Sequence, residues 1–179
     1  MEKELIDGFV SLIFKLVDML IPFEKMPDHS RVWIYQADRK FNMAEMKELG
    51  INTASFLEQW AAHGAALKAS YEILHDQFLV LSVDEGYNAA SGCSIDSSVH
   101  FIQSQEQLLG VNFFDRTKVA FVQNGDVFLE SVQNLKSKAN SGVITSDVLT
   151  FDNLVTNKKE FDERWCVPAK NTWLARYFN

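Results

Sequence analysis

The sequence predicts an α+β fold: a ferredoxin-like βαββαβ core with an added hairpin strand and a helical C-terminal extension. The first observation is the order of apolar patterns, which reads strand, helix, strand, strand, helix, strand, as in the split βαβ motif. The second is composition, because 47% hydrophobic and 23% charged residues in a chain of 179 are typical of one globular domain. The third is the small number of glycines and prolines, eight and three, which favours short connections.

The N-terminal segment, residues 1–21, is predicted to form an amphipathic helix that precedes a single α+β domain over residues 22–179. One apolar stripe at helical spacing runs through it: Leu5, Phe9, Leu12, Leu16 and Met19. The apolar run is shorter than the ~20 residues of a membrane span, and the chain does not begin with net positive charge. We therefore expect neither a span nor a signal peptide. The domain core should cover about residues 30–130 and the C-terminal extension residues 131–179.

The first part of the core is predicted from local patterns. Arg31–Gln36 is apolar on both faces, which is typical of a central strand. Asn42 and Glu45 have the spacing of a capping box, which begins a helix. Gly50 should interrupt this helix, and Gly64 should end its second piece.

Two strands and a second helix are predicted next. Ala69–Ile73 alternates apolar and polar residues, as an edge strand does, whereas Phe78–Val83 is almost continuously apolar and predicts a second central strand. A polar, small-residue loop follows over Asp84–Cys93. Ser94 is predicted to cap the next helix, which Gly110 should end.

Asn124-Gly125 lies between two short apolar runs and predicts a hairpin with a type I′ turn. The patterns after the hairpin are weaker. They predict helices near residues 132–138 and 158–165, an extended piece near residues 148–151, and a terminal helix after Pro168.

The predicted sheet needs a cover on both faces. In a ferredoxin-like fold the two helices cover one face, and the first and third strands are central. The other face must then be covered by the aromatic C-terminal segment, by the N-terminal helix or by a second subunit. If it stays uncovered, it should be an interaction site, and a homodimer is one expected result.

The loop before the second predicted helix carries the residues best suited to chemistry. Free backbone N–H groups at a helix N-terminus favour an anion or a thiolate, so Cys93 could act as a nucleophile. In this hypothesis Cys93 is the nucleophile, and the residues that assist it are His63, Asp84 and Asp96. The anion-binding loop consists of Gly92, Ser94 and Ser97. The alternative interpretation is structural, with Gly92 in the turn, Ser94 as the cap and Cys93 filling a small hole.

Composition and spacing disfavour several function classes. The formal charge of −7, from 17 basic and 24 acidic side chains, argues against a nucleic-acid partner. The four histidines lack metal-ligand spacing, and no GxxxxGKS, GxxxxGKT or GxGxxG motif is present, so neither a metal nor another cofactor is predicted. Cys93 and Cys166 are far apart, which favours a reducing cytoplasm over a disulfide scaffold.

Five segments of the chain resemble a family of short, uncharacterised bacterial proteins. The segments are Pro22–Lys25, Val32–Arg39, Trp60–Gly64, Ala90–Val99 and Phe114–Phe121. The resemblance extends from about residue 21 to the C-terminus, and residues 1–20 lie outside it. Members of the family often carry the label ABC transporter ATPase, so the resemblance implies ATP hydrolysis, but it implies no particular catalytic residues.

These observations predict a cytoplasmic α+β module that binds a small molecule or a protein, or that self-associates, rather than a catalyst. The alternative is a small enzyme with Cys93 as a thiolate nucleophile. ATPase activity ranks last, because the sequence lacks the phosphate-binding loop that this chemistry requires.

Overall fold

A computed structural model of the chain describes residues 21–178, so the helix predicted over residues 1–21 lies outside the described residues, Ile21 excepted. Helices and strands both occur in the described part, which confirms the α+β class. The strands are β1 (Arg31–Gln36), β2 (Ala61–Ala62), β3 (Ala65–Ala66), β4 (Ala69–Leu74), β5 (Phe78–Val83), β6 (Lys118–Gln123), β7 (Asp126–Ser131), β8 (Leu149–Phe151) and β9 (Cys166–Pro168). The α-helices are α2 (Met43–Gln59), α3 (Gly92–Leu109), α4 (Leu135–Asn140) and α5 (Lys158–Arg164). Short 3-10 helices are η1 (Phe23–Lys25), η2 (Val132–Asn134), η3 (Ala169–Asn171) and η4 (Trp173–Tyr177).

The first sheet is antiparallel and has the strand order β1-β5-β4. β5 lies at its centre and is buried along its whole length, as its continuous apolar sequence predicts. β4 lies at an edge, as predicted for Ala69–Ile73. β1 was predicted to be central, but it is the other edge: within residues 21–178 its outer side forms only an isolated bridge, between Arg31 and Asn157.

The strand expected beside β1 belongs to a second sheet. β6 pairs with β7 and β8 in the order β7-β6-β8-β9. The Asn124-Gly125 turn between β6 and β7 has positive φ at both residues, 54° and 85°, as a type I′ turn requires. The hairpin is thus confirmed. The ferredoxin-like core is not, since β6 leaves the first sheet.

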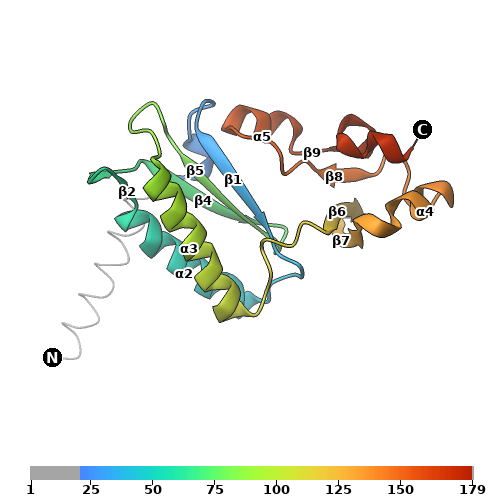
Figure 1. Cartoon of the computed structure of the whole chain (residues 1–179), viewed down its shortest axis with the longest axis horizontal. Helices are drawn as coiled ribbons and strands as arrows, with labels where there is room; N and C mark the ends of the chain where they lie inside the picture. Colours follow the sequence, from blue (N-terminus) through green and yellow to red (C-terminus); the bar gives the residue numbers. More distant parts are fainter. Residues whose placement is uncertain (1–20, 179) are drawn as a thin grey trace.

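The two sheets are stacked between helical layers (Figure 1). α2 and α3 cover one face of the first sheet, where Leu79 and Leu81 of β5 belong to the same buried cluster as Leu49 and Ile102. The opposite face packs against the second sheet and α5 through a second cluster. The C-terminal half of the chain itself therefore covers the sheet face that was considered for self-association.

A third cluster lies on the outer face of the second sheet, where Phe121 packs with Leu135 of α4 and Leu174 of η4. The C-terminal extension is helical only in part, since it also supplies β8 and β9. The segment after Pro168 forms the 3-10 helices η3 and η4 in place of the predicted terminal helix.

Local predictions in the first helix were partly correct. The capping box is present, with the Asn42 side chain accepting from the Glu45 N–H and the Glu45 side chain accepting from the Asn42 N–H. The predicted interruption at Gly50 is wrong, because α2 continues through it. The helix also ends earlier than Gly64, which forms the tight β2–β3 turn with His63 at positive φ.

Candidate functional site

Two of the residues proposed for catalysis meet in one hollow of about 520 Å³, which we call the Cys93 hollow. It lies where the end of α2 and the β2–β3 turn approach the N-terminus of α3, and Cys93, His63 and Ser97 all line it. The indole N–H of Trp60 donates to the carbonyl oxygen of Ser94 at 2.8 Å and holds the two helices together there.

The serine side chains of the predicted anion-binding loop form hydrogen bonds within the first turns of α3. Ser91, and not Ser94, is the N-cap of α3. The buried Ser94 hydroxyl donates to the Ser91 carbonyl at 2.8 Å and accepts from the Ser91 N–H at 2.7 Å. Ser97 donates to the Ser94 carbonyl at 2.7 Å. Gly92 is exposed in the first turn of α3, and Asp96 is exposed without lining the hollow.

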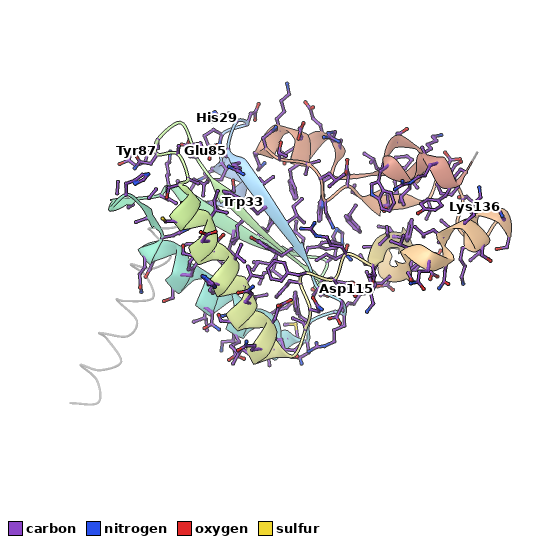
Figure 2. The ribbon with its side chains drawn as sticks, viewed as in Figure 1. His29, Trp33, Glu85, Tyr87, Asp115 and Lys136 are labelled. Atoms are coloured by element: carbon purple, nitrogen blue, oxygen red, sulfur yellow. The ribbon has the colours of Figure 1, made fainter. Side chains whose placement is uncertain are left out.

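Asp84 also lies outside the Cys93 hollow and has a different role. Its buried carboxylate bonds to His29 Nε2 at 2.9 Å, to Lys68 Nζ at 3.2 Å and to the Gly86 N–H at 3.1 Å. Burial alone would raise the pKa of Asp84, but these hydrogen bonds outweigh it, and the pKa lies below its usual value. Asp84 thus fixes the turn after β5. His29, which the sequence did not single out, lies beside this turn (Figure 2).

A larger hollow of about 870 Å³ follows the outer edge of β1, and we call it the β1 groove. One wall comes from residues 113–119, which span the end of the α3–β6 connection and the start of β6. The other comes from residues 151–156 and from η4. Trp33 on β1 and Asp115 on the α3–β6 connection are two of its lining residues (Figure 2).

Hydrogen bonds at both ends of β1 show which backbone groups point into the groove. At the start of the strand, the Ser30 carbonyl accepts from the Lys158 N–H at 2.8 Å. The Val32 N–H donates to the backbone carbonyl of Thr156 at 3.0 Å. Past the end of the strand, the Asp38 N–H donates to the backbone carbonyl of Asn112 at 3.1 Å. Because backbone directions alternate along a strand, even-numbered residues face outward. Ile34 lies between these contacts, and its N–H and C=O have no partner within residues 21–178.

Aromatic side chains line the groove. The Tyr35 ring lies edge-on to the rings of Phe113 and Phe114, at centroid distances of 6.5 and 6.0 Å. Phe114 and Trp173 are each 37% exposed, although both are large apolar side chains. Burial raises the pKa of Tyr35, so its phenol is neutral at pH 7. The groove therefore offers apolar surface beside an unpaired strand edge.

The charges around the groove are mostly positive, in contrast to the chain as a whole. Arg116 and Arg176 have no acidic partner in the described part of the chain. The Arg176 guanidinium instead lies 4.8 Å from the centroid of the Trp173 ring. Within residues 21–178, Arg31 and Lys118 have only long ion pairs, the Arg31–Glu85 pair at 3.7 Å and the Lys118–Asp115 pair at 3.8 Å among them.

The sequence prediction missed the β1 groove. The one available signal was the segment Phe113–Lys118, which places two aromatic and two basic residues within six positions. Its meaning depends on β1 being an edge strand, and the sequence predicted β1 at the centre of the sheet.

Across residues 21–178 we find no set of histidine, cysteine or acidic side chains arranged to hold a metal ion. The same residues contain no helix of the length and apolarity needed to cross a membrane. A scan of protein-family models and searches of curated proteins and solved structures gave no match to this chain. The resemblance to the family labelled ABC transporter ATPase therefore stays a prediction, and the functional proposal depends on the geometry.

Proposed function

We propose that the chain is a non-catalytic binding module whose site is the β1 groove. The observation that supports it is the unpaired backbone of Ile34 at the edge of a sheet, inside an aromatic groove of about 870 Å³. A volume of this order suits a bound ligand. Exposed strand edges bind extended peptides by adding a strand, so the ligand class is a protein segment and not a second subunit packed on a sheet face.

The proposal includes a cytoplasmic location for the protein. Both Cys93 and Cys166 are free thiols, which is consistent with a reducing compartment. A homodimer through this sheet face does not fit the structure, because β6, β7, β8 and α5 cover that face.

The direct test is the variant Ile34→Pro with Ile34→Ala as its matched control. Both remove the isoleucine side chain, but only proline removes the N–H, which has no internal partner to lose. Peptides selected from a random displayed library on the wild-type protein should bind Ile34→Ala and lose at least about tenfold in affinity for Ile34→Pro, a difference of about 1.4 kcal/mol. Circular dichroism would verify that both variants fold.

Two results of this selection would contradict the proposal. One is a library that yields no binding peptide. The other is a set of selected peptides that bind Ile34→Pro as well as Ile34→Ala, because such peptides would not use the strand edge.

A second candidate function is a small enzyme with Cys93 as nucleophile. It is supported by the shared hollow of Cys93 and His63. Asp84 would take no part in it, because this carboxylate is held by His29 and Lys68. Thiol titration separates the two candidates: if Cys93 reacts at the rate of an ordinary exposed thiol, the enzyme proposal fails.

A further inference from the structure

We infer that the occupant of the β1 groove is an extended segment of another protein that carries acidic side chains. The inference rests on the binding function proposed above and names the partner for the same site. Three features support it: the open backbone of β1, the two arginines without acidic partners in the described residues, and the exposed apolar side chains that line the groove.

The open backbone groups of β1 favour pairing with a peptide strand over binding of a simple anion. The outward-facing groups of Val32 and Ile34 include two carbonyl oxygens and one N–H without a partner in the described residues. A free anion could accept from the N–H but would be repelled by both carbonyls. A peptide strand supplies donors and acceptors in alternation and can pair with all three groups.

The added strand must be short. The chain itself pairs with the start of β1 through Thr156 and Lys158. At the other end, the Gln36 side chain donates to the Lys118 carbonyl at 3.2 Å and accepts from Asn153 at 3.1 Å, which joins the two walls. The open length from Val32 to Gln36 is about 13 Å at ~3.3 Å per residue, so about four residues of a partner can lie along it.

The charges call for acidic side chains on that strand. Arg116 and Arg176 come from different segments, line the same groove and have no acidic partner within residues 21–178. A guanidinium pairs with a carboxylate through two parallel hydrogen bonds, which gives direction as well as attraction. The chain as a whole carries excess negative charge, whereas the charged side chains that line this groove are mostly basic, so the groove attracts an acidic segment that the net charge would repel.

The apolar lining fits the alternation of an extended segment. Successive side chains of a strand point to opposite sides. A segment in which acidic and apolar residues alternate can direct its carboxylates toward Arg116 in one wall, while its other side chains contact exposed apolar groups in the opposite wall. Leu154 is 69% exposed and Trp173 is 37% exposed at this site.

The inference is tested with three synthetic peptides of about seven residues, blocked at both ends, in which valine alternates with aspartate, serine or lysine. Each carries a fluorophore, and binding to the full chain is followed by anisotropy. The aspartate peptide should bind at least about tenfold more tightly than the lysine peptide at about 50 mM salt, and the difference should shrink at about 500 mM salt. The serine peptide should fall between them.

Charge reversal gives the matched comparison. The double variant Arg116→Glu and Arg176→Glu should lose the preference for the aspartate peptide or invert it. Lys47→Glu makes the same change of charge sign on the exposed surface of α2, away from the groove, and should leave the preference unchanged.

The outcomes distinguish this inference from the function on which it rests. If all three peptides bind equally and Ile34→Pro weakens all of them, the groove accepts strands but the acidic partner is wrong. If none of the three binds, the inference fails, and the library selection alone decides the proposed function. If the free protein is a dimer that Ile34→Pro dissociates, the occupant is a second copy of this chain, and the inference is overturned.

Discussion

Asp84 shows how a candidate catalytic residue can instead be a structural one. Its carboxylate receives hydrogen bonds from an imidazole, an ammonium group and a backbone N–H, and its side chain is only 9% exposed. Gly86 lies so close that an added Cβ would come within 2.7 Å of His29 Nε2. The carboxylate therefore stabilises the turn between β5 and α3, and Asp84 lines neither hollow.

Replacement of Asp84 by asparagine should destabilise the protein by about 2 kcal/mol at pH 7, because the buried acceptor loses its charge and one of its two acceptor oxygens becomes an NH2 group that faces a donor. The pKa of Asp84 is depressed in the folded protein, so its stabilisation is present above the unfolded-state value of about 3.9 and is lost as the pH falls through the lower folded value. Urea unfolding of both proteins should show a difference that narrows below about pH 4.

The exposed Asp96 provides the control for this measurement. Asp96→Asn should change the free energy of unfolding by no more than about 0.5 kcal/mol at pH 7. An Asp84→Asn protein as stable as the wild type at pH 7 would show that the three hydrogen bonds do not stabilise the turn.

Among the elements, the turn between β4 and β5 contacts the second sheet. The His75 ring lies 5.0 Å from the ring of Phe151 in β8 and 5.9 Å from that of Trp165. Burial lowers the pKa of His75, and Lys40 acts in the same direction, whereas Asp76 opposes it. The His75 side chain is exposed, so its imidazole lies at the rim of the contact between the two sheets.

We expect His75→Asn to flatten the dependence of stability on pH near neutrality. Since the folded pKa of His75 is depressed, its neutral ring stabilises the fold above the unfolded-state value of about 6.5, and this stabilisation is lost as the pH falls toward the folded value. Asparagine tolerates the positive φ of 52° at this position. The measurement is urea unfolding between about pH 5 and about pH 7.5.

The prediction is decided by how steeply the free energy of unfolding of each protein changes with pH. Its absolute value is no test, because His75→Asn also loses ring contacts at every pH. The wild type should lose stability toward pH 5 more steeply than His75→Asn. Parallel curves would mean that another group, and not His75, makes the contact between the sheets sensitive to pH.

The sequence predicted elements correctly where the signal is local. The capping box at Asn42, the Asn124-Gly125 hairpin and the buried strand β5 each depend on a few adjacent residues. The pairing of β6 with β8 joins residues about thirty positions apart and has no comparable local signal. β1 was misplaced because burial of both faces was interpreted as pairing at both edges, and these two properties are independent.

The candidate site was predictable only in part for the same reason. The sequence alone could not show whether Cys93 and His63 lie near each other. In the structure both residues line one hollow. The β1 groove combines β1 with four segments that lie far from it in sequence. Its binding groups are partly backbone atoms of Ile34, which no residue pattern can identify.

At the scale of the whole molecule, the edge of β1 is the sheet edge that borders the β1 groove, whereas β4, β7 and β9 form the other edges of the two sheets. The first sheet is covered on both faces by the chain itself, so strand pairing is left to its edge strands, β1 and β4. The groove lies along β1 and is flanked by arginines in a protein of net charge −7. This combination of a covered core and an uncovered edge is the basis of the binding function that we propose.

Amide hydrogen exchange of β1 tests that claim most directly. In the free protein the Ile34 N–H should exchange rapidly, whereas the Trp33 and Tyr35 N–H groups, which face β5, should exchange slowly. Addition of the valine–aspartate peptide should slow exchange at Ile34 by at least about tenfold. An Ile34 N–H that is as protected as that of Tyr35 in the free protein would contradict the account, because the edge of β1 would already be paired.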